Sequence, residues 1–251
     1  MKRKIKLFKD GRFDISSATL HIIAMSLMLM DHLWATLLPA QDWLTCAGRI
    51  AFPIFAFMTV EGYFYTHNLK NYIFRLFFLA LFSEIPFDLM CEGTWFYPFH
   101  QNVIWTFLIG IAGIHLMEKL RKNKWTDVLS VMMIVLTGML IGTVCMVDYY
   151  GAGVLTVFGF YLLRGRKLNC LAGQFLILYF VNTKLLGGLI YPVYILGMRF
   201  DFMQQGFAIL ALIPIWLYRD RQGYHSKFFQ YSCYLFYPIH MFLLALITIF
   251  L

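Results

Sequence analysis

The residues best suited to chemistry lie inside apolar runs. In "LMLMDHLW", residues 27–34, an aspartate and a histidine stand side by side as Asp31 and His32. A carboxylate near the middle of a bilayer costs about 2.5 to 3.5 kcal/mol even on the mildest insertion scale. A cost of this size indicates that these side chains have polar partners in the folded protein or take part in its chemistry.

The composition places these residues in a membrane. Of the 251 residues, 61% are hydrophobic and only 14% are charged, whereas about 25% are charged in soluble domains. Apolar runs of spanning length follow one another without a polar stretch long enough for a soluble domain. We therefore expect an integral membrane protein with a basic cytosolic tail, residues 1–16, and a single transmembrane helical domain, residues 17–251.

The charge distribution and the cysteine spacing argue against nucleic acid and metal ions as partners. The formal charge of +8 does not indicate nucleic-acid binding, because the basic residues cluster in short segments between apolar runs, as topology signals do. The five cysteines lie far apart without metal-ligand spacing, so no metal site is expected. Membrane lipids are the expected surroundings.

The pattern predicts an all-α, polytopic bundle of about nine to ten spans. Six basic residues precede the first span, which predicts a cytosolic N-terminus. The expected spans are residues 17–38, 47–66, 72–90, 103–116, 127–147, 152–163 and 228–251, with shorter segments at 168–182, 185–198 and 207–218. Either all three short segments cross or one is re-entrant or merely buried, so the side of the basic loop "RDRQGYHSK" and of the C-terminus stays open.

Helix geometry predicts where the residues of the first span point. His21 and His32 are 11 residues apart, which leaves them about 20° from alignment and about 16 Å apart along the axis. Both histidines therefore face one way. Asp31 lies one step around the helix from His32, so we expect its partner on a neighbouring helix.

The second and third spans carry further charges. Arg49 and Glu61 are twelve residues apart, which places them about 120° apart on an ideal helix and predicts different neighbours. Glu84 and Asp88 share one helix face, and two adjacent carboxylates resist joint ionisation without a cation. Arg49, at the same depth, is the expected partner of this pair.

Polar residues also mark the later spans. Asn102 opens the fourth span, and Asp148 and Tyr149 stand at the outer turn before "GAG". In the last span Tyr237 and Pro238 precede His240. A helix interrupted by proline beside a histidine lines a cavity or a packed polar site, because lipid cannot satisfy the freed backbone carbonyl. The pattern leaves open whether this site is functional or only structural.

Two chemistries suit the buried polar residues. Acids and histidines at several depths can relay protons or coordinate a transported ion, while one histidine facing a cavity can serve as the general base of a group-transfer enzyme. Periodicity does not choose between them. The sequence shows no tandem or inverted repeat of the kind many transporters carry, which weakens the proton- or ion-coupled transporter.

The chain resembles the TraX family, named for the F-pilin N-terminal acetylase, and is more distantly similar to the membrane acyltransferase-3 superfamily. The resemblance covers nearly the whole chain. The motifs that carry it, in order, are "MDH" at Asp31 and His32, "GRIAFPIFAF" from Gly48, "EG" at Glu61, "IPFDL" from Ile85, Asn102 before "VIWT", "DYYGAGVL" from Asp148 and "YPIH" from Tyr237.

The resemblance implies an acyltransferase that uses acyl-CoA, with acetyl-CoA the expected donor. The superfamily carries a basic residue, ten intervening residues and then a histidine regarded as the catalytic base; here these positions are His21 and His32. His21 stands where lysine or arginine is usual, and a histidine is only partly charged near pH 7. A neutral His32 would take a proton from an amine or hydroxyl acceptor that attacks the thioester.

The resemblance also implies roles for the other polar residues. Asp31, or a carboxylate of the second or third span, would orient His32, and His21, Lys70 and Arg75 would hold the phosphates of the donor at the cytosolic rim. Candidates for the oxyanion donors are Asn102, Tyr149, Tyr237 and His240. The complete set of expected substrate- or cofactor-binding residues is His21, Arg49, Glu61, Lys70, Arg75, Asp88, Asn102, Asp148, Tyr149, Tyr237 and His240.

The acceptor is not readable from the residues. A pilin-like peptide, a glycan, a lipid and a small molecule all fit, since family membership does not imply a pilin in every case. The expected location is the bacterial cytoplasmic membrane, with several passes and the N-terminus in the cytosol.

Overall fold

The computed structural model describes residues 14–121 and 124–251. Most of this part of the chain is helical, and its elements in order are α1 Ser17–Thr36, α2 Asp42–Gly48, α3 Ala51–Tyr65, α4 Leu69–Glu92, α5 Val103–Leu120, α6 Lys124–Val144, α7 Tyr150–Leu162, α8 Leu168–Phe180, the π-helix η1 Val181–Leu186, the strands β1 Ile190–Ile195 and β2 Met198–Met203, the 3₁₀-helix η2 Gln204–Ala211, α9 Leu212–Leu217 and α10 Lys227–Phe250. The predicted all-α class is confirmed. The expected tail, residues 1–16, lies almost entirely outside the described residues.

Polar side chains begin several of the long helices. In four helices the residue before the first turn accepts a hydrogen bond from a backbone N–H of that turn: Ser16 for α1, Asn68 for α4, Asn102 for α5 and Ser226 for α10. These N-caps satisfy N–H groups that have no partner within the helix. The start of α1 at Ser17 agrees with the boundary expected from the sequence.

The surface is that of a membrane protein, but the expected nine to ten spans are not supported. Within the described ranges, five helical stretches are long and apolar enough to cross a bilayer: Ser17–Thr36, Asp42–Tyr65, Val103–Leu120, Asp127–Val144 and Lys227–Phe250. Large apolar side chains along these helices are exposed, as Leu129 and Leu140 are on α6. Helix α4 carries several charged residues along its length, and α7 and α8 have only 13 residues each.

The segment 185–198 does not form the expected helix. It contributes to an antiparallel hairpin in which β1 pairs with β2 and Ile195 lies opposite Met198. The two turn residues, Leu196 and Gly197, both have positive φ angles, as the tight hairpin turns that match strand twist require. Alternating aromatic and branched residues around a glycine favour this hairpin over a helix. The segment 207–218 likewise forms η2 and the short α9.

The basic loop "RDRQGYHSK" after α9 lies next to the start of α1. Ile15 forms a parallel bridge with Tyr218, and the backbone N–H of Ser17 donates to the carbonyl of Arg221 at 2.8 Å. The Arg166 guanidinium also donates to the carbonyl of Tyr218. The loop after α9 therefore lies beside the start of α1, as expected if one of the three short segments does not cross.

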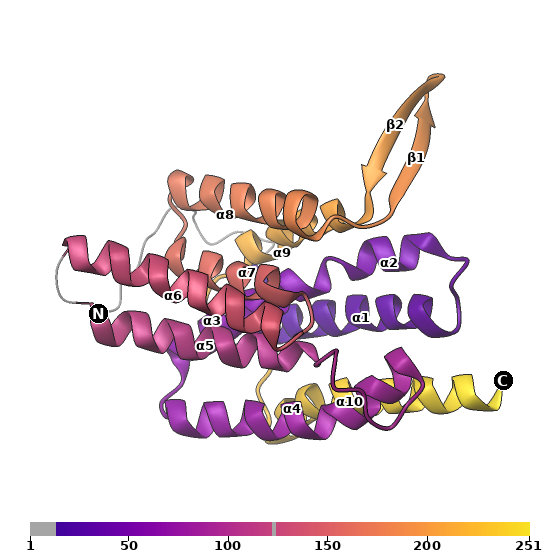
Figure 1. Ribbon diagram of the computed structural model, residues 1–251, viewed down its shortest axis with the longest axis horizontal. Coiled ribbons are helices and arrows are strands. Elements are labelled where there is room, and N and C mark those ends of the chain that lie inside the picture. The colour runs from indigo at the N-terminus through magenta and orange to yellow at the C-terminus, as the bar shows by residue number, and fades with distance from the viewer. Residues whose placement is uncertain (1–13, 122–123) are drawn as a thin grey trace.

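The helices pack around α1 and α3. Figure 1 shows α4 and α10 along one face of the bundle and α8 along the opposite face, with the hairpin projecting from the end that holds the α1–α2 connection. One buried cluster joins α1, α3, α5, α7 and α9, and a second joins α1, α4, α5 and α10. Helix α1 contributes to both clusters, which places its polar residues at the centre of the bundle.

Candidate functional site

Asp31 and His32 point toward different helices, as their positions on α1 predict. Both carboxylate oxygens of Asp31 lie 2.5 Å from Nη2 of Arg49. The hydroxyl of Thr45 donates to Oδ1 of Asp31 at 2.7 Å. The charge of Asp31 is therefore neutralised by α2 and the break that follows it, and not by His32.

The expected pairing of Arg49 with Glu84 and Asp88 is wrong. The second span is interrupted, because α2 ends at Gly48 and α3 begins at Ala51. Arg49 lies in this break, and its guanidinium turns toward α1. A Cβ at Gly48 would lie 2.3 Å from Cβ of Asp31, so only glycine allows α1 and α2 to approach this closely.

Hydrogen bonds connect the Asp31–Arg49 pair, through Thr45, to the segment that follows the hairpin. The side-chain amide of Gln204, the first residue of η2, donates to the Thr45 hydroxyl at 2.6 Å, and Gln204 is buried. Thr45 thus connects a carboxylate in α1 with the base of the hairpin. Neither Thr45 nor Gln204 was expected from the sequence, and their residue types give no signal of this role.

His32 pairs with His240 of α10. Nδ1 of His32 lies 2.7 Å from Nε2 of His240. The ring centroids are 4.9 Å apart and the planes differ by 8°. Because the centroid separation is much longer than the distance between the nitrogens, the two rings meet edge to edge in nearly one plane rather than face to face. The other ring nitrogen of His240, Nδ1, lies 2.6 Å from the carbonyl oxygen of Phe236.

Tyr237 lies beside this histidine pair. It precedes His240 by three residues on α10, and the two ring centroids are 6.2 Å apart. Its side chain is buried, and its hydroxyl oxygen lies near the backbone N–H of Val103. No described residue accepts a hydrogen bond from its O–H. A buried O–H without an acceptor is costly, so the Tyr237 hydroxyl can donate to a bound ligand or water. Helix α10 runs through Pro238 without ending.

Asn102 is fully used by the fold. Its amide donates to Oε1 of Glu84 at 2.7 Å and to the carbonyl of Ala80 at 2.9 Å. Its carbonyl oxygen accepts from the backbone of Ile104. The indole of Trp105 also donates to Oε1 of Glu84. Glu84 is therefore stabilised by neutral donors, without the cation that the sequence indicated.

Asp88 is buried and has one free oxygen. Oδ2 accepts from the backbone N–H of Tyr97 at 2.8 Å, and Oδ1 has no hydrogen-bond partner in the described part of the chain. Tyr97 belongs to the loop between α4 and α5. Asp88 thus fixes this loop, which the sequence did not indicate.

The loop also brings His100 to Asp148. Nε2 of His100 lies 3.8 Å from Oδ1 of Asp148, and Nδ1 lies 3.4 Å from Oε1 of Glu92. Asp148, followed by Glu92, raises the pKa of His100, although partial burial opposes this shift. The next residue, Tyr149, has a positive φ angle. Its ring stacks on the ring of Phe52, with the centroids 4.1 Å apart. The structure thus places Asp148 and Tyr149 at the turn before α7, as expected.

Glu61 is buried and forms a second ion pair, with an arginine that is exposed. Its two oxygens accept from Nε and Nη2 of Arg164 at 2.7 and 3.0 Å. The guanidinium of Arg164 also lies over the ring of Phe64. Glu61 and Arg49 thus have different partners, as predicted. Arg164 begins the basic segment "RGRK", residues 164–167, and was not among the expected site residues.

The remaining candidates lie apart from the histidine pair. Lys70 and Arg75 on α4 are exposed. His21 is partly buried, and its Nδ1 lies 2.8 Å from the carbonyl oxygen of Ser17, on its own helix. None of the three forms a hydrogen bond or an ion pair with His32, so a role in binding the donor stays a prediction.

The sequence of this chain matches the family described as TraX protein over residues 16–248. The chain belongs to the TraX family. It is also similar to the probable fimbrial assembly protein FimC, serogroup H1, of Dichelobacter nodosus, with 33% identity over 78 residues. That match covers 30% of this chain and 32% of the relative, so the chain spans about a third of the length of the curated relative. No solved structure matches.

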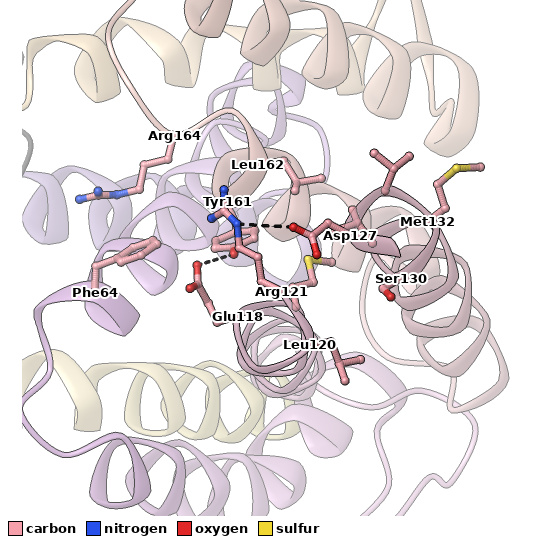
Figure 2. Close-up of a pocket in the computed structure, with 13 residues that line it drawn as sticks. Phe64, Glu118, Leu120, Arg121, Asp127, Ser130, Met132, Tyr161, Leu162 and Arg164 are labelled. Carbon is pink, nitrogen blue, oxygen red and sulfur yellow. Dashed lines mark hydrogen bonds and ion pairs between the residues drawn. The ribbon is translucent and has the colours of Figure 1, made fainter. Parts of the chain in front are cut away.

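A cavity of this TraX-family protein lies away from the histidine pair. It has a volume of about 580 Å³ and lies among the ends of α5, α6 and α7, with Phe64 of α3. Figure 2 shows Tyr161 directed toward Glu118 and Arg121 toward Asp127 across its wall. Tyr161 donates to Glu118 at 2.6 Å, and Arg121 lies 4.0 Å from Asp127. The residues expected to bind substrate or cofactor do not line this cavity.

Among residues 14–121 and 124–251, no group of three or more His, Cys, Asp or Glu side chains could hold a metal ion. The two histidine nitrogens at 2.7 Å are too close for an ion between them, since each zinc–nitrogen bond takes about 2.0 Å. The pair is therefore a hydrogen bond.

Proposed function

We propose that this TraX-family membrane protein is an acyltransferase that moves an acetyl or other acyl group from acyl-CoA to an amine or hydroxyl acceptor. His32 is the general base. The observation that carries the proposal is that Nδ1 of His32 is hydrogen-bonded inside the bundle, whereas Nε2 has no hydrogen bond to another described residue. A base needs one positioned nitrogen free to take a proton.

The reaction follows from this free nitrogen. The acceptor N–H or O–H gives its proton to Nε2 of His32 as its heteroatom attacks the thioester carbonyl carbon. The carbon–sulfur bond then breaks, and the leaving thiolate of CoA takes the proton back from Nε2. Such a base contributes about 10² to 10⁴-fold to the rate.

The buried hydroxyl of Tyr237 supplies a donor for the oxyanion. The ring of Tyr237 lies beside the ring of His240. Its hydroxyl oxygen lies near the backbone N–H of Val103, and no described residue accepts its O–H. Of the other candidates, Asn102 and His240 use their side-chain nitrogens in contacts within the protein. Tyr149 lies at the turn before α7 and not on α10 beside the histidine pair. We therefore assign the oxyanion donor to Tyr237.

The donor approaches from the end of the bundle that holds the basic loops. His32 follows Ser17 by 15 residues on α1, which is about 22 Å along the helix. An extended pantetheine arm has to cover this depth while the phosphates stay at the rim. The exposed cations Lys70 and Arg75 are assigned to the phosphates.

A pilin-like peptide is the acceptor that the comparison favours over a glycan, a lipid or a small molecule. The similar protein is named as a fimbrial assembly protein, and the shared part is short. On this proposal the protein acts in the bacterial cytoplasmic membrane with its N-terminus in the cytosol. Six basic residues before α1 support that orientation.

Calorimetry tests the donor. Detergent-purified protein should bind acetyl-CoA saturably, and Arg75→Ala should weaken binding at least about tenfold, as the loss of a phosphate contact predicts. Arg199→Ala is the matched control, because Arg199 is an exposed cation on the hairpin at the other end. No binding at millimolar ligand would contradict the proposal and favour a proton- or ion-coupled transporter.

Activity tests the base. His32→Gln should insert and fold but release CoA from acetyl-CoA at least about 10²-fold more slowly than the wild type in the presence of acceptor. His21→Gln is the control on the same helix, and it should keep the catalytic rate while it changes the KM for the donor. Full activity of His32→Gln would remove His32 from the reaction.

A further inference from the structure

Two hydrogen bonds connect His32 to His240 and His240 to the carbonyl oxygen of Phe236, and the second sets the direction of the first. The carbonyl oxygen of Phe236 can only accept, so Nδ1 of His240, 2.6 Å away, carries a proton. In a neutral imidazole the other nitrogen is then an acceptor. Nε2 of His240 therefore accepts a hydrogen bond from Nδ1 of His32 across 2.7 Å. This order leaves the lone pair of His32 on Nε2.

We infer that His240 is a positioning residue that holds His32 in the tautomer protonated at Nδ1, so that Nε2 faces the acceptor as a base. The catalytic consequence rests on the proposed function. The tautomer itself follows from the contacts of a neutral His240 and does not depend on the proposed function. The resemblance implied that His240 is a candidate oxyanion donor. The contacts indicate instead that His240 orients the base.

The packing fixes this arrangement. His240 is 6% exposed and lies against the ring of Phe236, with centroids 4.6 Å apart and planes that differ by 16°. Its ring cannot turn over without losing the bond to the Phe236 carbonyl. On the other side, the hydroxyl of Thr36 donates to the backbone carbonyl of His32 at 2.7 Å, which secures the last turn of α1.

A neutral imidazole suits this place better than a carboxylate. In serine hydrolases a buried aspartate orients the histidine and stabilises its protonated form. Here the neighbouring carboxylate, Asp31, is bound to Arg49 and Thr45. An orienting group without charge avoids a second buried anion within the membrane, which would cost several kcal/mol. The resting site therefore has no net charge on the histidine pair.

The test is the tautomer of His32, observed by nitrogen NMR of ¹⁵N-histidine protein in detergent. The chain has seven histidines, and the His32→Gln and His240→Gln variants assign the two signals by their loss. We expect His32 of the wild type to be protonated at Nδ1. Protonation at Nε2 in the wild type would overturn the inference, whatever the activity.

Two matched substitutions at position 240 test the positioning role. His240→Phe keeps an aromatic ring but removes the acceptor, so the Nδ1 preference of His32 should be lost and kcat should fall about 10²-fold, with little change in KM. His240→Gln keeps an oxygen that can accept from Nδ1, so it should keep the tautomer and lose less than about tenfold in kcat. Thermal unfolding of both variants reports whether each is folded.

The outcomes separate the inference from the proposed function. If His240→Phe keeps both the tautomer and the rate, His240 does not position His32. If His240→Phe does not fold, the wild-type tautomer and the His240→Gln variant decide. If the wild type shows the expected tautomer but transfers no acyl group, the proposed function fails and the hydrogen-bond assignment stands.

Discussion

Two ion pairs, Asp31–Arg49 and Glu61–Arg164, use the same chemistry in different surroundings. In the first, both side chains are 17% exposed, and in the second Glu61 is 9% and Arg164 36% exposed. The first pair lies beside His32 and joins α1 to the break before α3. The second connects α3 to the loop after α7, where the arginine reaches water. The comparison shows that Arg49, beside His32, has less access to solvent than Arg164.

The largest effect is expected for Asp31→Asn. This change leaves the buried guanidinium of Arg49 without its anion, which should lower the free energy of unfolding by about 3 to 5 kcal/mol. Titration with denaturing detergent, followed by circular dichroism, measures the change. The double variant Asp31→Asn with Arg49→Met is the control and should recover much of the loss. A single variant as stable as the wild type would contradict the importance of this pair.

Gly48→Ala tests how closely α1 and α2 must approach. The added Cβ would lie 2.3 Å from Cβ of Asp31, so the helices must separate, at a cost of about 1 to 3 kcal/mol. Separation should also lengthen the Arg49 contact and, on the proposed function, reduce acyl transfer. Gly206→Ala, where an added Cβ meets nothing within 4 Å, is the matched control. Equal stability of the two variants would show that the backbone adjusts at Gly48.

Glu61→Gln should have a smaller effect than Asp31→Asn. Arg164 can reach solvent after the loss of its partner, so the cost should be about 1 kcal/mol. Salt should reduce the difference between wild type and variant, because the pair is partly screened. A loss as large as that of Asp31→Asn, measured in the same titration, would remove the distinction between the two pairs.

The smallest effect concerns pH. Asp148 raises the pKa of His100 above its ordinary value of 6.5. A raised pKa contributes stability that is fully present below pH 6.5 and is lost as the pH rises through the raised value. The wild type should therefore exceed His100→Gln in stability at pH 5.5, with the difference shrinking toward pH 8.5. A difference that grows with pH would have the wrong sign.

The sequence by itself determined the class of the protein and the direction of several side chains. Apolar runs with basic connections indicate a membrane protein of helices, because a bilayer requires the backbone groups of each span to bond within it. Helical periodicity placed Asp31 and His32 toward different neighbours, and it separated the partners of Arg49 and Glu61. The motifs indicated the TraX family, which the match over residues 16–248 confirms.

Only the tertiary structure decided which groups meet. Arg49 pairs with Asp31 and not with Glu84 or Asp88, because the helix breaks at Arg49 and Gly48 lets α1 approach. His32 and His240 are 208 residues apart in sequence, and no periodicity relates them. The segment 185–198 contributes to a hairpin whose two turn residues, Leu196 and Gly197, have positive φ angles. Local patterns fix the direction of a side chain on its own helix, whereas its partner depends on how distant helices pack.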